Sequence, residues 1–255
     1  MTPPLLDVAD LRLRIGGAEI LRGVSFAMGR ERLGIVGQSG SGKSQTARAI
    51  LRLLPAGATL AAARLDFDGI DLLAADAAAM RGLRGRRLGL VLQDPRFALN
   101  PIMTIGAQIV EACPGAGRRA AREKALALLE AVSIREPQRV FDRYPHQLSG
   151  GMGQRAMIAM MLAADPDLLI ADEPTAALDS GIRNETLAVL DREVSRRGMG
   201  LILISHDLDL VAGFCDRVLV MEEGRVVEDC AATALAAAAH PATRRLLAAR
   251  AGLAL

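Results

Sequence analysis

Five short stretches of consecutive apolar residues dominate the hydropathy pattern of this chain. They are RLGIVG (32–37), RLGLVLQD (87–94), DLLIAD (167–172), GLILISHD (200–207) and RVLVMEEG (217–224). Each has the length of a strand without the alternation of a half-exposed one, which indicates burial on both faces, as in a parallel sheet. Helical patterns lie between them, including residues 43–54 and 184–198. The alternation predicts a doubly wound α/β sheet.

Polar groups follow four of these five stretches. The groups are a glycine-rich loop, Gln93, the pair Asp172–Glu173 and the pair Ser205–His206. Ligands of open parallel sheets bind beyond the carboxyl ends of the strands. We therefore expect these groups, which are spread over much of the sequence, to converge on one edge of the sheet.

Residues 96–165 contain no comparable apolar stretch and are predicted to be mostly helical, with an amphipathic segment at 122–132. This pattern indicates a helical subdomain inserted between two parts of a core, residues 1–95 and 166–230. A C-terminal tail, residues 231–255, contains the alanine run ATALAAAA (232–239) and is expected to be helical.

Composition and charge exclude several classes of protein. A net charge of +2 is too small to indicate a nucleic-acid-binding protein, and we expect no nucleic-acid partner. The three cysteines are far apart, which argues against a zinc site or a disulfide framework. No signal peptide is visible, and no apolar run approaches the roughly 18 residues of a membrane span. We expect a soluble chain that reaches a membrane only through a partner.

The sequence GQSGSGKS (37–44) follows an apolar strand and opens a helix, which is the context of a P-loop. Its glycines allow backbone N–H groups to surround phosphate oxygens, and the helix N-terminus adds partial positive charge. Lys43 can reach the terminal phosphates, and the Ser44 hydroxyl can ligate Mg²⁺. The predicted nucleotide-binding residues of this loop are Gly37, Gln38, Ser39, Gly40, Ser41, Gly42, Lys43, Ser44 and Gln45.

Two carboxylates and a histidine are the candidate catalytic groups. LLIADEP (168–174) ends a buried strand with Asp172, which is suited to holding Mg²⁺ through water, and Glu173, which is suited to polarising an attacking water. His206 ends another strand at the same predicted edge, where it can sense the γ-phosphate of ATP. We assign no chemistry to His146 or His240.

In this order the motifs resemble the ATP-binding subunits of ABC transporters, over about residues 7–230. The matching segments are the P-loop, the Q-loop glutamine Gln93, the signature LSGGM (148–152), the Walker B segment (168–173), the D-loop AALD (176–179) and the switch histidine His206. The resemblance implies an ATPase that uses ATP and Mg²⁺. It also implies a P-loop NTPase (RecA-like) core with an antiparallel β edge and an inserted helical subdomain.

The resemblance further implies a head-to-tail dimer, in which each signature meets the ATP held by the P-loop of the other subunit. The signature residues expected to contact that ATP are Leu148, Ser149, Gly150, Gly151 and Gln154. Asp179 would help to shape the dimer interface. Mg²⁺ would be held by Ser44 and Gln93, with Asp172 reaching it through water. Gln93 would also couple the nucleotide state to membrane subunits.

Within the family, stretches such as YPHQLSGGM (144–152) are most similar to the dipeptide, oligopeptide and nickel importer group. Membership implies uptake of peptides, nickel or a metal chelate, at the cytoplasmic face of the bacterial inner membrane. The implied partners are a second, related ATPase subunit, two integral membrane permease subunits and, indirectly, an extracytoplasmic solute-binding protein.

Three residues depart from the family pattern. Ile15 occupies the place of the aromatic residue that usually stacks on adenine, Arg30 stands at a turn position that is commonly glycine, and Gly153 replaces a basic residue. Two alternatives stay open beside the importer ATPase. One is a soluble ABC-type ATPase acting on nucleic acid or ribosomes, and the other is an ATP-binding regulatory partner with weak hydrolysis.

Overall fold

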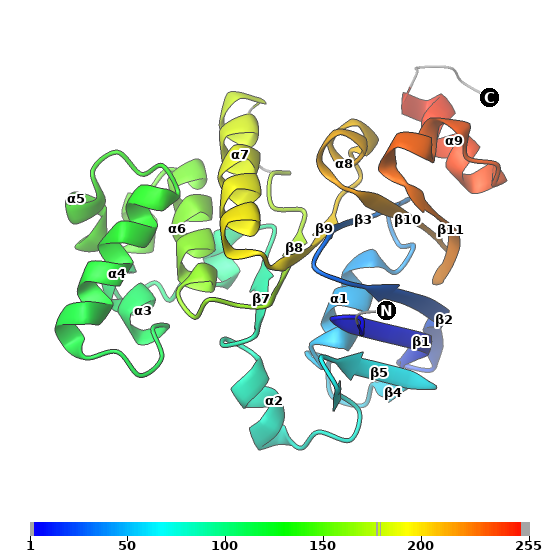
Figure 1. The fold of residues 1–255 in the computed structure, drawn as a ribbon, viewed down its shortest axis with the longest axis horizontal. Helices are drawn as coiled ribbons and strands as arrows, with labels where there is room; N and C mark the ends of the chain where they lie inside the picture. Colours follow the sequence, from blue (N-terminus) through cyan, green and yellow to red (C-terminus); the bar gives the residue numbers. More distant parts are fainter. Residues whose placement is uncertain (1–2, 177, 179, 251–255) are drawn as a thin grey trace. The chain divides into compact units, whose positions relative to one another are not determined.

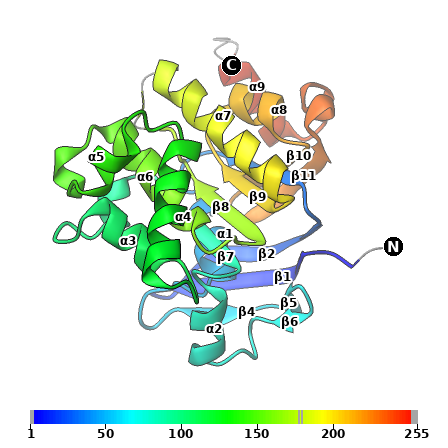
Figure 2. The ribbon, with the colours of Figure 1, turned by 60° about the vertical axis from the view of Figure 1, so that its left-hand side comes forward.

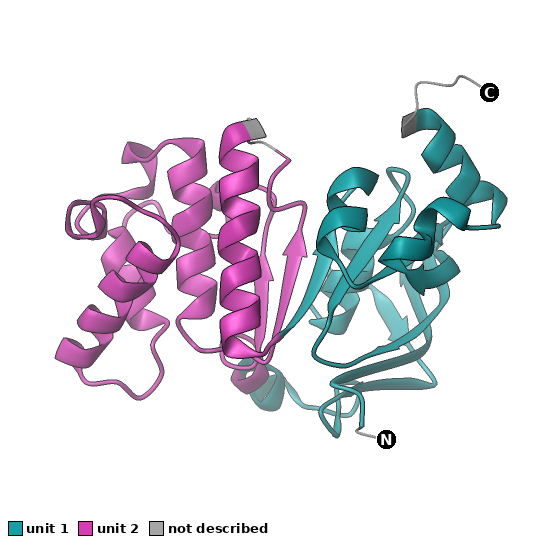
Figure 3. Ribbon diagram, turned by 45° about the horizontal axis from the view of Figure 1, so that its top comes forward, with its two compact units in different colours: residues 1–81, 200–255 teal, residues 82–199 magenta. Residues whose placement is uncertain are grey.

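The computed structural model describes residues 3–176, 178 and 180–250. The chain divides into two compact units, shown in different colours in Figure 3. Unit 1 comprises residues 1–81 and 200–255, and unit 2 comprises residues 82–199. The boundary falls within the short helix α2 (Ala77–Leu83).

Unit 1 contains an antiparallel sheet and a group of mainly parallel strands. The antiparallel sheet has the order β2-β1-β5-β6, with β4 pairing β1. In the other group β3 pairs in parallel with both β9 and β10, and β11 is antiparallel to β10. The antiparallel strands are β1 (Leu6–Ile15), β2 (Ala18–Met28), β4 (Thr59–Ala61), β5 (Arg64–Phe67) and β6 (Ile70–Asp71). The second group is β3 (Arg32–Gly37), β9 (Gly200–Ile204), β10 (Arg217–Glu222) and β11 (Arg225–Ala231).

The helices of unit 1 cover both faces of the parallel strands. In Figures 1 and 2, α8 and α9 lie on one side of β3, β9 and β10, and α1 and the antiparallel sheet lie on the other. The approach of α8 is close, because a Cβ atom at Gly34 of β3 would lie 2.2 Å from Cγ1 of Val211. These helical segments are α1 (Lys43–Ile50), α8 (Leu208–Phe214), the 3₁₀ turn η3 (Ala232–Ala237) and α9 (Pro241–Arg250).

A carboxylate holds the start of α9 against β11. Glu228 accepts hydrogen bonds from the Ala239 N–H (3.3 Å), the His240 N–H (3.0 Å) and the Thr243 hydroxyl (2.9 Å). Desolvation opposes ionisation of Glu228, but these hydrogen bonds outweigh it and hold its pKa below the ordinary value. The C-terminal helix is therefore tied to the sheet through charge-assisted bonds at its N-terminus.

Unit 2 joins a parallel pair of strands to a cluster of helices. β7 (Leu88–Val91) pairs in parallel with β8 (Leu168–Asp172), and no strand occurs in residues 92–167, all of which are described. In Figure 1, α3 to α6 lie together, and α7 lies beside β8. The helical segments are η1 (Pro95–Phe97), α3 (Ile105–Glu111), α4 (Arg118–Ala131), α5 (Pro137–Phe141), η2 (Pro145–Gln147), α6 (Gly150–Leu162) and α7 (Ser180–Arg197).

The structure confirms the strands and the helical insertion expected from hydropathy. Strands occupy all five apolar stretches, and β8 and β9 are buried along their whole lengths. The amphipathic segment 122–132 lies in α4, whose buried residues include Ala125, Leu128 and Leu129. The alanine run 232–239 forms η3, a 3₁₀ turn rather than an α-helix. None of the described helices combines the length and apolar character needed to cross a membrane. The four-part division at 95, 165 and 230 stays a prediction.

Candidate nucleotide-binding site

The glycine-rich loop of unit 1 lies between β3 and α1. Lys43, the first residue of α1, is only 7% exposed, and its Nζ donates to the carbonyl oxygens of Gly37 (2.8 Å) and Gln38 (2.9 Å). The Lys43 ammonium group thus bridges two backbone carbonyl groups of the loop. The turn between β10 and β11 supports the loop from outside, because the Gly224 N–H donates to the Ser41 carbonyl (3.0 Å).

Two of the loop glycines are required by the geometry. Gly42, at the N-cap of α1, has a φ of 103°, which side chains disfavour. At Gly37 a Cβ atom would lie 2.2 Å from the main-chain oxygen of Met221 and 2.7 Å from Oγ of Ser41. No side chain caps the N-terminus of α1. This arrangement is suited to phosphate oxygens.

Buried polar atoms in this loop also indicate a ligand. The Ser41 hydroxyl and Oε1 of Gln45 are buried and have no hydrogen-bond partner among the described residues. Buried polar groups are otherwise almost always hydrogen-bonded, so such atoms need an explanation. Gln38, Ser39 and Gly40 are exposed at the tip of the loop, where a nucleotide can reach them.

His206 lies at the same edge of unit 1 as the loop. It follows β9, which pairs in parallel with β3, so both strands end on the same side. Its neighbours fix the backbone: the Ser205 N–H donates to the Ile35 carbonyl (3.2 Å), and the Asp207 N–H donates to Oγ of Ser205 (3.0 Å). His206 itself is exposed. Unit 1 therefore brings the predicted phosphate loop and the predicted γ-phosphate sensor to one edge.

Unit 2 brings Gln93, Asp172 and Glu173 to one edge in the same way. Gln93 follows β7 and is exposed, while Asp172 is the last residue of the neighbouring parallel strand β8 and is 9% exposed. Convergence of this group with the loop of unit 1 stays a prediction from the sequence pattern.

The backbone at Glu173 is a feature that the sequence did not indicate. Its φ is 49°, in the left-handed region that glycine favours. The alternation of side chains between the two faces of strand β8 therefore ends at Asp172. The backbone conformation of the turn then sets the direction of the Glu173 side chain. Strained backbone of this kind is concentrated at functional sites and costs on the order of 1–3 kcal/mol.

The signature segment forms a second helix N-terminus, in unit 2. Ser149 is the N-cap of α6, its Oγ accepts from the Met152 N–H (3.3 Å), and both Ser149 and Gly150 are exposed. Gly151 is buried because α7 packs close: a Cβ atom there would lie 2.7 Å from Cγ2 of Ile182. Gln154 is 1% exposed and donates to the carbonyl of Leu92 (3.2 Å), just before Gln93. Sequence reasoning missed this link between the signature helix and the Q-loop.

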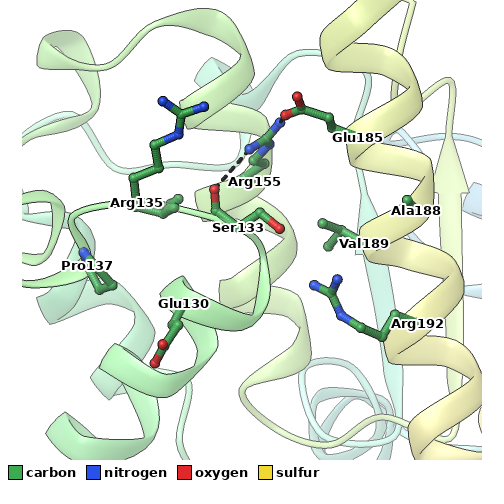
Figure 4. Close-up of a pocket in the computed structure, with 10 residues that line it drawn as sticks. Glu130, Ser133, Arg135, Pro137, Arg155, Glu185, Ala188, Val189 and Arg192 are labelled. Carbon is green, nitrogen blue, oxygen red and sulfur yellow. Dashed lines mark hydrogen bonds and ion pairs between the residues drawn. The ribbon is translucent and has the colours of Figure 1, made fainter.

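Several cavities in the described part of unit 2 adjoin this helix. One of about 580 Å³ lies between the 94–101 segment and the signature, and its lining includes Leu99, His146, Ser149 and Gly150. Another, of about 470 Å³, is drawn in Figure 4 and lies between the 130–137 segment and α7. In it Arg155 donates to the Ser133 carbonyl (3.0 Å) and pairs with Glu185.

The predicted interface residue and the predicted adenine-contacting residue differ in how the structure describes them. Asp179, the predicted interface residue, lies outside the described residues. Ile15, at the predicted adenine position, ends β1 and is half-buried.

The donor set fits Mg²⁺ in its chemistry. The hydroxyl of Ser44, the amide oxygen of Gln93 and the carboxylate of Asp172 are hard oxygen ligands, which this ion prefers. Ser44 lies in the first turn of α1 and is half-buried. No group of three His, Cys, Asp or Glu side chains able to hold a metal occurs in the described part of the chain.

Comparison with known proteins gives consistent matches along the chain. A family model described as ABC transporter matches residues 21–176. The probable peptide ABC transporter ATP-binding protein y4tR of Sinorhizobium fredii is 48% identical over 253 residues, which cover 95% of this chain and 76% of that protein. The dipeptide transport ATP-binding protein DppD of Haemophilus influenzae is 42% identical, with 95% and 76% coverage. The oligopeptide transport ATP-binding protein OppD of Mycobacterium tuberculosis is 45% identical over 88% of this chain, which spans only 38% of that protein.

Solved structures agree on the fold. The cassette MJ0796, a dimer in a post-hydrolysis state bound to ADP and Pi, superposes with a TM-score of 0.79 at 26% identity, covering 89% of this chain and 98% of that one. CbiO1 of Clostridium perfringens, part of the ABC transporter complex cbiONQ, superposes with a TM-score of 0.81 at 26% identity, covering 100% and 96%. The fold is therefore that of a P-loop NTPase with mixed α/β structure.

Proposed function

The chain belongs to the ABC transporter family, as an ATPase, and on that premise we propose that it is the ATP-hydrolysing subunit of a peptide importer. The observation that carries the proposal is the pair of helix N-termini preceded by glycine- and serine-containing segments: α1 behind the loop at 37–44, and α6 behind Ser149. Peptides are proposed as the solute because y4tR, DppD and OppD are named for peptide, dipeptide and oligopeptide transport. These names favour an importer over an ATPase acting on nucleic acid or ribosomes.

In the proposed mechanism the P-loop binds the ATP phosphates through its backbone N–H groups and Lys43. The Lys43 ammonium, which holds the Gly37 and Gln38 carbonyls, turns to the terminal phosphates when they enter. Glu173 orients the attacking water and accepts its proton, and His206 hydrogen-bonds the γ-phosphate. Mg²⁺, held by Ser44 and Gln93 and through water by Asp172, would neutralise phosphate charge.

The second helix N-terminus serves a second subunit. A P-loop already supplies a lysine, so the signature needs only hydrogen-bond donors, which Ser149 and the first N–H groups of α6 provide. We propose that Leu148, Ser149, Gly150 and Gly151 face the ATP of a related ATPase subunit in a head-to-tail dimer. Gln154 would support the signature helix from its buried side, since its side chain is buried and donates to the Leu92 carbonyl. The dimeric structure of the similar cassette MJ0796 supports the formation of a dimer.

The remaining partners follow from importer membership. We propose two integral membrane permease subunits, contacted at the cytoplasmic face of the bacterial inner membrane, and an extracytoplasmic peptide-binding protein that acts through them. Asp179 is proposed to contribute to the dimer interface.

The test is phosphate release by the purified chain with ATP and Mg²⁺. Glu173→Gln should lower the rate by a factor on the order of 10²–10⁴ while ATP binding persists. Glu223→Gln is the matched control, because Glu223 also has a left-handed backbone (φ 47°) but lies in the β10–β11 turn. A Glu173→Gln protein that hydrolyses ATP at the rate of the Glu223→Gln protein would refute the assignment. Co-purification with peptide permease subunits tests the importer role.

A further inference from the structure

We propose that the exposed side chains of Tyr144 and His146 form a stacking platform for the adenine of the ATP held by the facing subunit. The proposal rests on the head-to-tail dimer of the proposed function, and it assigns recognition of the base to unit 2. Neither residue has a role in the phosphate chemistry described above.

Tyr144 and His146 are already arranged as a stack. Their ring centroids are 5.7 Å apart, and the ring planes differ by 14°. Tyr144 is the only tyrosine in the chain and is 39% exposed, and His146 is exposed as well. A stacked pair that leaves aromatic surface in solvent offers a flat partner to another ring, such as a nucleotide base.

The backbone between the two side chains is held rigidly. The Tyr144 N–H donates to Oε1 of Gln147 (2.9 Å), and the Gln147 N–H donates to the Tyr144 carbonyl (3.0 Å). Arg143 donates to the carbonyl of Gln147 (3.3 Å). Little ordering is therefore needed when a base binds, which favours affinity.

The platform lies beside the signature serine. His146, Ser149 and Gly150 line the same cavity of about 580 Å³, and Leu99, Pro101 and Leu148 supply an apolar wall. Cavities of roughly 300–1,000 Å³ with apolar walls and few polar groups are typical of small-molecule sites. A nucleotide whose phosphates meet Ser149 is therefore already close to His146.

None of the phenylalanines in the described part of unit 1 has an exposed ring, and the exposed His206 of that unit is assigned to the γ-phosphate. The three phenylalanines are Phe26 (6% exposed), Phe67 (fully buried) and Phe214, which is half-buried with the Arg32 guanidinium 5.8 Å from its ring. The residue at the adenine position expected from the sequence is the aliphatic Ile15. We therefore assign the aromatic partner of the base to unit 2.

The experiment measures ATP-dependent association of the full chain carrying Glu173→Gln, with itself and with its related ATPase subunit, by sedimentation velocity. Tyr144→Ala combined with His146→Ala should raise the half-maximal ATP concentration about tenfold, which corresponds to about 1.4 kcal/mol. Mg²⁺ with inorganic tripolyphosphate, which has no base, should support association equally in both proteins. Ile15→Tyr should restore most of the lost ATP affinity, because it supplies a ring from unit 1. Tyr144→Phe should match the parent.

Matched controls separate base stacking from other roles. Phe97→Ala removes an aromatic ring that is 82% exposed in η1 and should leave the ATP dependence unchanged. Tyr144→Leu with His146→Leu keeps apolar bulk without a ring and should behave like the double alanine variant, so a folding defect of the latter cannot decide the result.

Three outcomes would overturn the proposal. If the parent associates with ATP neither with itself nor with its related ATPase subunit, the head-to-tail dimer of the proposed function fails, and the platform fails with it. If the parent associates and the double variants match it within twofold, only the platform fails. If ATP and tripolyphosphate are weakened equally, the pair supports the protein interface or a membrane partner instead of the base.

Discussion

The substitution Gly37→Ala tests whether close packing behind the P-loop requires a residue without a side chain. Gly37 is the last residue of β3 and pairs with Met221 of β10, and an added Cβ would lie 2.2 Å from the Met221 carbonyl oxygen. Ordinary packing contacts are about 3.5 Å, so the backbone of β10 must move by about 1 Å. The displaced group is main chain, which cannot rotate away. Overpacking of this kind typically costs about 1–3 kcal/mol, and we expect the upper end of that range.

The control for this substitution is Gly40→Ala, in the same loop. Gly40 has a φ of 82°, but a Cβ there would meet no atom within 4 Å, so its substitution introduces backbone strain without a clash. We expect it to cost about 1 kcal/mol. Thermal unfolding without nucleotide measures both variants, at about 2–4 °C per kcal/mol for a chain of this size. If Gly37→Ala lowers the melting temperature less than Gly40→Ala does, the packing argument is wrong.

Three further predictions concern strain, pH and thiol chemistry. Glu173→Gly should raise the free energy of unfolding by about 1 kcal/mol, because it relieves the left-handed backbone, and it should abolish ATP hydrolysis. Glu223→Gly, at a residue with a φ of 47°, should raise the free energy of unfolding equally and keep the ATPase activity. Calorimetry and a phosphate-release assay compare the two variants. The lowered pKa of Glu228 stabilises the fold above the ordinary glutamate pKa, and this contribution is lost as pH falls through the lower folded value. Glu228→Gln should therefore lose about 1 kcal/mol at pH 7 and flatten the acid side of the stability profile, whereas an unchanged profile would contradict the role of that carboxylate. Burial, and to a smaller extent the charge of the neighbouring Asp216, raises the pKa of Cys215 to about 12. In native protein at pH 8, alkylation should therefore modify the half-buried Cys230 before Cys215. Mass spectrometry of the labelled peptides measures the order, and modification of Cys215 first would contradict the prediction.

Much of the candidate site was predictable because its signals are local. The spacing from Gly37 to Ser44 places glycines, a lysine and a hydroxyl at one strand–helix junction, and the structure has β3 and α1 on either side. Ser149 belongs to the signature segment that the sequence indicated, and it is the N-cap of α6. Capping and loop preferences act over a few residues, so the sequence carries them directly.

Other features depend on contacts between residues far apart in the chain. Gln154 was expected to contact a nucleotide, but the structure buries it against Leu92, 62 positions earlier. The pairing of Tyr144 with His146 and the cavity beside it also escaped the hydropathy pattern, because they arise from loops and 3₁₀ turns without periodicity.

The sequence by itself determined the strands, the two glycine-containing helix starts and the family, because each is written in short-range patterns of apolar, small and charged residues. Only the tertiary structure decided what Lys43 binds before a nucleotide enters, how the backbone turns at Glu173, and which aromatic rings stay at the surface. The physical reason is that burial, strain and stacking are properties of packed neighbours, and those neighbours come from segments that the sequence holds far apart.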